Sequence, residues 1–281
     1  MIKLTGSCDA HCHVFGPYGA FPPSSATTYV PPLAPFDRHQ SMMADTGMDR
    51  AVLVQPTSYY LDHSALIDAL SRAPGRLKGI GVIDGSTSDR ELSDMRVAGI
   101  VGLRFVEMPN PNGNGRYPGT SGFDVARQTA GTLREHGFHV QLWAPLRTCV
   151  ELAAEAKALG LTLVLDHMAG IGPETSLSDP DFLGLLDALD QGNVWIKLTY
   201  HRQSRLPHDY GDMKRAMLAL VECNARRLLY ASDWPFVRME GREPDPRYLI
   251  KQLHDWVGQG PAKDILVNNP ATLFGFPKEE S

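Results

Sequence analysis

Cysteine is scarce in this sequence, and no CxxC pair occurs. Four cysteines in 281 residues are too few for a disulfide-stapled scaffold, and their wide spacing does not suggest a thiolate metal site. The four are Cys8, Cys12, Cys149 and Cys223. We therefore expect free thiols and a reducing, cytoplasmic environment.

Long apolar runs and clusters of one charge sign are absent as well. No run approaches the roughly 20 apolar residues of a membrane-spanning helix, and the first residues lack the apolar core of a signal peptide. The 27 basic and 32 acidic residues give a net charge of −5, without a Lys/Arg cluster. Neither a nucleic acid nor an anionic membrane is therefore an expected partner.

Short apolar runs alternate with longer amphipathic ones along the chain, which is typical of strand-then-helix units. The strand candidates are 7–14, 50–56, 78–83, 100–106, 138–144, 161–168, 193–199 and 227–234. Eight such units predict an α/β fold, a (β/α)8 barrel formed by 1–281 as one domain. A doubly wound open sheet is the main alternative. Two long, Pro- and Gly-rich segments, 16–35 and 107–122, follow predicted strands and are expected to border the active face.

Two histidines stand one residue apart in the first predicted strand, in the stretch SCDAHCHVFGP. Alternate side chains of a strand share a face, so His11 and His13 point the same way and Cys12 points oppositely. Two imidazoles on one face can bind a metal, polarise a carbonyl group or satisfy local hydrogen bonds.

Polar residues also end the other predicted strands, where the functional side chains of a barrel lie. They are Gln55, Thr57, Ser58, Arg104, Gln141, Trp143, Asp166, His167, Lys197, Thr199, His201, Arg202, Ser232 and Asp233. Taken singly, a histidine here can be structural, and Asp166 or Asp233 can cap a turn. Arg104 is harder to explain structurally, because an unpaired buried guanidinium is costly. Three histidines and an aspartate at the ends of the first, sixth and eighth strands form a specific constellation.

The motifs DAHCH, LDHM, YASDWP and NNPATLFGF resemble, in this order and over nearly the whole chain, the amidohydrolase superfamily. The similarity is to its branch of 2-pyrone-4,6-dicarboxylate lactonases and galactarolactone isomerases. The resemblance implies a distorted (β/α)8 TIM barrel, in agreement with the count of predicted strands.

The resemblance also bears on metal binding. Metal-dependent amidohydrolases combine the first-strand HxH and the last-strand Asp with a histidine of strand five, and binuclear members often add an anionic ligand on strand four. Here strand four carries Arg104, and His139 lies at the beginning of strand five. The lactonase branch works without metal, so we expect no cofactor. The alternative is one Zn²⁺ held by His11, His13, His167 and Asp233.

The implied reaction is hydrolysis of a lactone. We expect Asp233 to activate water as general base, and His11, His13 and His167 to polarise the carbonyl through their N–H groups. The alternatives are a lactone isomerase of the galactarolactone type, a Zn-dependent amidohydrolase or decarboxylase, and a non-catalytic binding barrel.

Arginine suits carboxylates because its planar fork binds them bidentately. The residues that match family positions for substrate binding are Arg104, Arg202, Tyr29, Thr57 and Ser58. The lactonase has a second arginine six residues after the one matching Arg104, where this sequence has Asn110. We therefore predict a small carboxylated lactone as substrate. Asn110 in place of this arginine favours a monocarboxylate or a sugar-acid lactone over an aromatic dicarboxylate, unless Arg116 replaces the missing cation.

Overall fold

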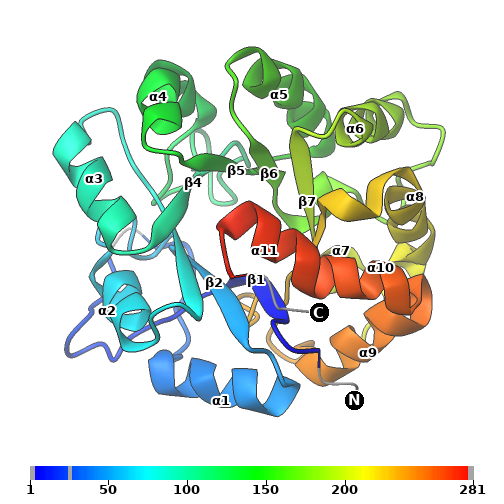
Figure 1. Ribbon diagram of the computed structural model, residues 1–281, viewed down its shortest axis with the longest axis horizontal. Helices are drawn as coiled ribbons and strands as arrows, with labels where there is room; N and C mark the ends of the chain where they lie inside the picture. The colour runs from blue at the N-terminus through cyan, green and yellow to red at the C-terminus, as the bar shows by residue number, and fades with distance from the viewer. Residues whose placement is uncertain (1–3, 25–26, 278–281) are drawn as a thin grey trace.

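The computed structural model describes residues 4–24 and 27–277 of the chain. Its eight strands are parallel and follow one another in chain order around a nearly closed barrel (Figure 1). They are β1 (Cys8–Cys12), β2 (Arg50–Val54), β3 (Leu77–Gly81), β4 (Ile100–Val106), β5 (His139–Trp143), β6 (Leu163–Leu165), β7 (Val194–Leu198) and β8 (Leu228–Tyr230). The predicted barrel fold is confirmed.

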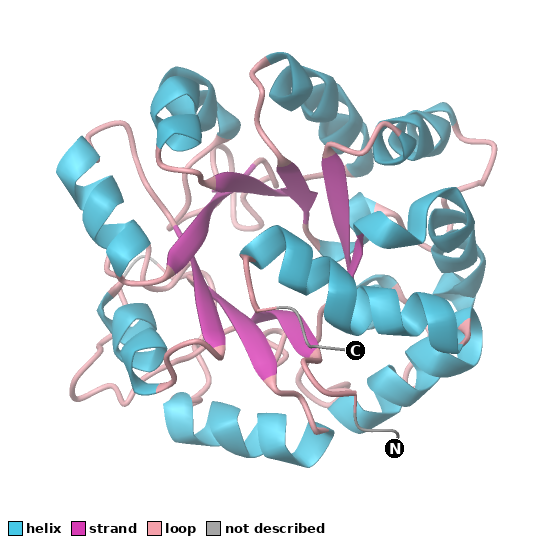
Figure 2. Ribbon diagram, in the orientation of Figure 1, coloured by secondary structure: helices cyan, strands magenta, loops and turns pink. Residues whose placement is uncertain are grey.

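Helices surround the barrel as an outer layer (Figure 2). The α-helices are α1 (Phe36–Thr46), α2 (Ser64–Arg72), α3 (Asp89–Val97), α4 (Phe123–Glu135), α5 (Leu146–Ala158), α6 (Pro180–Asp190), α7 (Tyr200–Gln203), α8 (Lys214–Asn224), α9 (Pro246–Val257), α10 (Gln259–Lys263) and α11 (Asn269–Phe274). Short helical turns are η1 (His167–Gly170), η2 (Gly211–Met213), η3 (Ala225–Arg227) and the π-helical η4 (Asp264–Asn268). In the described part of the chain, no helix is long and apolar enough to cross a membrane.

The barrel is closed at one end and open at the other. In Figure 1, α11 lies across the end where the strands begin. The ring of Phe274 there contacts that of His139 at a centroid distance of 5.5 Å, and Phe276 lies under Arg50 and Lys78. His139 is thus at the closed end, as its place at the start of β5 predicts. The barrel interior is therefore open at the end at which the strands finish.

The sixth predicted strand is shorter than the sequence suggests. The apolar pattern indicates 161–168, but β6 ends at Leu165, because His167, Met168 and Ala169 have left-handed backbones with φ of 49°, 57° and 55°. Such angles cannot continue a strand and are unfavourable for non-glycine residues. The turn places the His167 ring at the mouth of the barrel.

A short seam links β1 to the segment that follows β8. Backbone hydrogen bonds run from His13 N to Trp234 O and from Asp233 N to His11 O, each 2.8 Å long. The buried carboxylate of Asp9 accepts from the backbone N–H groups of His11, at 3.2 Å, and Ser232, at 3.0 Å. This seam brings the first and last strands' functional side chains together.

Candidate active site

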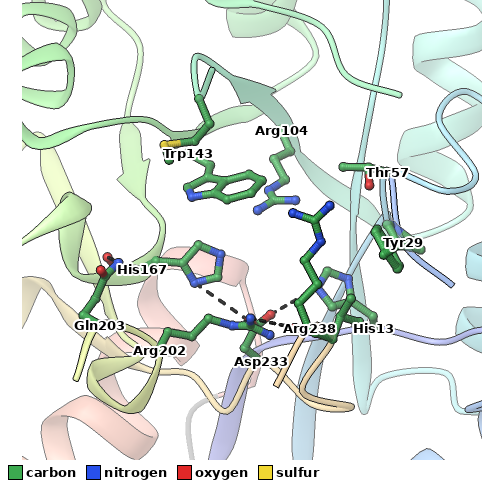
Figure 3. A pocket seen from close by; sticks show the side chains of 13 residues that line it. His13, Tyr29, Thr57, Arg104, Trp143, His167, Arg202, Gln203, Asp233 and Arg238 are labelled. Atoms are coloured by element: carbon green, nitrogen blue, oxygen red, sulfur yellow. Dashed lines mark hydrogen bonds and ion pairs between the residues drawn. The ribbon is translucent and has the colours of Figure 1, made fainter. Parts of the chain in front are cut away.

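A cavity of about 280 Å³ opens at the carboxyl ends of the strands (Figure 3). It is lined by His13, Tyr29, Pro56, Thr57, Arg104, Met108, Trp143, His167, Arg202, Gln203, Asp233, Val237 and Arg238. Both long loops predicted to border the active face contribute, through Tyr29 and Met108. The size suits a small-molecule ligand.

The three predicted histidines surround the carboxylate of Asp233. Its Oδ1 lies 3.2 Å from His13 Nε2 and 3.5 Å from His11 Nε2, and its Oδ2 lies 4.0 Å from His167 Nδ1. Arg202 Nε donates to the same Oδ2. The predicted convergence of these residues is therefore present in the structure, while their catalytic roles remain a prediction.

Asp233 is buried, yet it is held as a carboxylate. Burial alone would raise its pKa, but the Arg202 guanidinium, then His167 and the His13 hydrogen bond, together hold the pKa of Asp233 well below its usual range. Its backbone φ of 56° is left-handed, a conformation that Asp tolerates better than most residues.

A layer of buried charge lies beneath the cavity. Asp166 accepts from Arg104 Nε at 2.8 Å, and its Oδ1 lies 3.0 Å from Lys197 Nζ. Lys197 also donates to Gln141. Burial raises the pKa of Asp166, but Lys197, His11 and Arg104 outweigh it and hold that pKa well below its usual range. From the sequence, Lys197 was placed at a strand end without a role, and Asp166 was considered only as a turn cap. The sequence signal for this buried layer was the charge of Lys197 within the otherwise apolar strand β7.

Lys197 determines the tautomer of His11. Its Nζ forms a 3.0 Å hydrogen bond with His11 Nδ1, and an ammonium group can only donate. His11 Nδ1 therefore accepts, and the proton of the neutral ring is on Nε2, which faces Asp233. Burial, reinforced by Lys197, lowers the pKa of His11 well below its usual value, so the ring is neutral at physiological pH.

The other two histidines are oriented by local partners. His13 Nδ1 lies 2.7 Å from the carbonyl oxygen of Val54, which can only accept, so this nitrogen carries a proton. His167 Nδ1 lies 3.1 Å from Thr199 Oγ1. Burial lowers the pKa of His167 to about 4, which keeps this ring neutral at physiological pH.

The predicted substrate-binding residues divide into two groups. Arg104, Arg202, Tyr29 and Thr57 line the cavity. Ser58 is fully buried and is not among the lining residues, because the turn after β2 folds under the first long loop, where Ser58 O accepts from Ser24 N at 2.7 Å. In this conformation Ser58 does not contact the cavity, unlike the other four.

Neither Asn110 nor Arg116 reaches the cavity. Asn110 bonds within its own loop, where its side chain accepts from Asn112 N at 3.0 Å. Arg116 pairs with Asp124 on the surface at 2.8 Å. The charged lining residue that was not predicted is Arg238, which lies in a loop after β8 and carries no sequence signal beyond its charge.

Within residues 4–24 and 27–277, two groups of side chains have ligand types that suit a metal ion. His11, His13 and Asp233 form one, and His11, Asp166 and His167 form the other, each with donor atoms within 4.8 Å of one another. Both need His11, whose Nδ1 faces an ammonium and whose Nε2 carries the proton. Arg202 already neutralises Asp233, and Lys197 with Arg104 neutralises Asp166. These residues do not fit a divalent cation, because three side-chain cations already balance the two carboxylates.

The fold and this site define a barrel of the amidohydrolase type. The amidohydrolase family model matches residues 8–276, and the chain belongs to this family.

The relatives of the chain include lactone hydrolases. It is 32% identical over 278 residues to a 4-sulfomuconolactone hydrolase of Hydrogenophaga intermedia, covering 98% of this chain and 90% of that protein. It is 28% identical over 285 residues to a 2-pyrone-4,6-dicarboxylate hydrolase of Comamonas testosteroni, covering 98% and 91%. The crystal structure of a probable 2-pyrone-4,6-dicarboxylic acid hydrolase from Acinetobacter baumannii, with citric acid bound, superimposes with a TM-score of 0.81 at 25% identity, covering 96% of this chain and 100% of that one. The predicted family membership is confirmed, and these relatives support the prediction of a lactone hydrolase.

Proposed function

We propose that this protein hydrolyses a small carboxylated lactone in the cytoplasm, with Asp233 as general base and without a metal ion. The convergence of three imidazoles on the buried Asp233 carboxylate, in a cavity lined by arginines, is the observation that supports this most. The names of the relatives agree with a lactone as substrate. The cytoplasmic location is supported by four free cysteines.

The reaction needs a proton acceptor and a donor for the developing oxyanion. Asp233 takes a proton from water while the water oxygen adds to the lactone carbonyl carbon. The carbonyl oxygen becomes an oxyanion, stabilised by the rings of His13 and His167, which line the cavity. A well-placed donor of this kind contributes about 3 kcal/mol. His11 is fully buried and does not line the cavity, so its Nε2 acts on the reaction through Asp233, which it faces at 3.5 Å. The carbonyl then re-forms, the ring C–O bond breaks, and Asp233 returns its proton to the leaving oxygen.

The guanidinium of Arg202 makes two hydrogen bonds within the protein. Its Nε donates to Asp233, and its Nη1 donates to the Val237 carbonyl at 2.7 Å. No acceptor in the described part of the chain bonds its second Nη group, which is free to bind a substrate carboxylate. A carboxylate bound there would draw positive charge away from Asp233 and make it a stronger base.

Product analysis in ¹⁸O-labelled water tests this proposal. We expect an open-chain hydroxy acid or its keto form, one labelled oxygen richer than the lactone, with release of acid. Asp233→Asn should lower kcat by about 10³-fold, since a positioned general base contributes 10²–10⁴-fold. Asn tolerates the left-handed backbone, so the variant should fold. An isomer of unchanged mass, or full activity in Asp233→Asn, would refute the proposal.

A further inference from the structure

The cavity has more positive charge than the proposed chemistry requires. Its lining contains three arginines and one carboxylate, that of Asp233. The layer beneath adds one charge of each sign, from Asp166 and Lys197. Among the arginines, Lys197 and the two carboxylates, with the histidines left aside, the excess is two positive charges. One of these suits the carboxylate already expected on the lactone.

Arg238 is a cation that hydrogen-bonds only neutral groups in the part of the chain that the structure describes. Its Nη2 donates to Thr28 O and Thr28 Oγ1, both at 2.8 Å, and its guanidinium lies 5.7 Å from the ring centroids of Tyr29 and of Tyr117. No carboxylate within residues 4–24 and 27–277 forms an ion pair with it. The contacts orient Arg238 although its side chain is exposed at the cavity mouth, and among the described residues no acceptor bonds its Nε or Nη1.

Arg104 approaches the same space from the floor of the cavity. Its Nε is bound to Asp166, and its guanidinium lies 5.3 Å from the centroid of Trp143. Trp143 in turn contacts Tyr117 at a centroid distance of 5.1 Å. The guanidiniums of Arg104 and Arg238 therefore flank one aromatic wall, and Figure 3 shows both pointing into the cavity. Neither Nη group of Arg104 has an acceptor in the described part of the chain.

Two guanidiniums with unused donors, and no carboxylate between them, are typical of an oxyanion site. We propose that Arg238 and Arg104 bind a second anionic group of the substrate, a carboxylate or sulfonate, and that Arg238 selects lactones with two negative charges. This inference rests on the proposed function and refines it. Arg238 would supply, from the other side of the cavity, the cation that is missing at Asn110, so the substrate would be a dianion rather than a monocarboxylate.

Binding of unreactive ring acids tests the site independently of turnover. Isophthalate and 3-sulfobenzoate carry two anionic groups, and benzoate carries one. Calorimetry on the wild-type protein should show at least about tenfold tighter binding of a dianion than of benzoate, equivalent to about 1.4 kcal/mol. Arg238→Met should abolish this preference and leave benzoate binding within about threefold. Arg116→Met is the matched control, since that arginine pairs with Asp124 on the surface, and it should retain the preference.

Kinetics give the second readout. For 4-sulfomuconolactone, Arg238→Met should raise KM at least about tenfold and change kcat little, since it removes binding energy shared by ground and transition states. For the same lactone with hydrogen in place of the sulfonate, the KM should barely change. Equal binding of dianions and benzoate by the wild type, or a preference that survives in Arg238→Met, would overturn the inference. An intact preference in a protein that hydrolyses no lactone would instead refute the proposed function alone.

Discussion

The ammonium of Lys197 determines which nitrogen of His11 carries the proton. As a result, His11 Nε2 is a hydrogen-bond donor and cannot serve as a metal ligand. A zinc-bound imidazole offers the metal a lone pair, while its other nitrogen donates to an acceptor. His11 has the reverse arrangement, with Lys197 donating to Nδ1. Asp166 lies 3.2 Å from the same nitrogen and would accept its proton if Lys197 were absent.

Lys197→Met is therefore expected to weaken lactone hydrolysis and to create a zinc-binding site. With no ammonium, His11 Nδ1 can donate to Asp166, and Nε2 becomes free to bind zinc with His13 and Asp233. We expect zinc affinity to rise at least about tenfold and lactone hydrolysis to fall. Calorimetric zinc titration of the folded variant, checked by circular dichroism, measures this. Unchanged, weak zinc binding in Lys197→Met would contradict the assigned tautomer.

Arg202 is expected to set the acid limb of the pH–rate profile. Because its guanidinium helps to hold the pKa of Asp233 well below the usual range, the general base stays ionised to low pH. Arg202→Met removes that charge, so the pKa of Asp233 rises and activity is lost at a higher pH. We expect the acid limb of kcat/KM to move up by about one unit or more. Arg116→Met serves as the charge-matched control, and a limb that stays in place would exclude this role.

At the scale of single elements, loops position the site as much as strands do. The loop between β4 and α4 reaches Thr57 at Gly119, which has φ of 70°, and a Cβ there would overlap the Thr57 carbonyl oxygen. A glycine is therefore required both by the backbone conformation and by the close approach.

Gly119→Ala is expected to destabilise the protein and to disturb substrate binding. The left-handed backbone alone costs about 1–2 kcal/mol for alanine, and relief of the overlap must displace Thr57. Denaturant unfolding should show this loss, and KM should rise. Gly131→Ala, in the middle of α4 with open space around the new Cβ, is the control and should stabilise by about 0.5–1 kcal/mol. A neutral Gly119→Ala would show that the loop does not support Thr57.

The elements were predictable where hydrophobic periodicity decides them. All eight strands lie at or near their predicted positions, because buried parallel strands are apolar throughout. The end of β6 was not predictable, because left-handed angles at Met168 and Ala169 leave no mark in the pattern. β8 also ends earlier than predicted, at Tyr230 instead of residue 234. At the site, His11, His13, His167 and Asp233 were predictable from their strand-end positions. Arg238 was not, because its place depends on contacts with Thr28 far away in the sequence.

At the scale of the whole molecule, buried histidines make stability sensitive to acid. Burial lowers the pKa of His39, His63 and His167 to about 4, and that of His139 and His201 to about 3. The unfolded chain binds these protons below about pH 6.5, but the folded protein does not. Stability is therefore lost as pH falls from about 6.5 to 4. Asp9, whose pKa burial raises to about 6, opposes this with one carboxyl group.

We expect the free energy of unfolding to decrease by about 1.4 kcal/mol per pH unit for each net proton taken up. Urea unfolding between pH 7 and 4.5 measures this slope. His201→Phe, which keeps a ring among Tyr210 and Phe236, should reduce the slope by about one proton even if it changes stability at pH 7. Substitution of the exposed His208 by Asn should leave it unchanged. A flat pH dependence in the wild type would contradict the assignment of neutral, buried histidines.

Lactone turnover by protein of measured metal content tests the central claim most directly, because side-chain cations of the site are proposed to stand where a metal ion would. The same sample is assayed before and after chelation and again after addition of Zn²⁺. We expect the full rate with far less than one metal ion per chain, unchanged by chelator and not raised by zinc. A rate that falls with chelation and returns in proportion to bound zinc would contradict the claim.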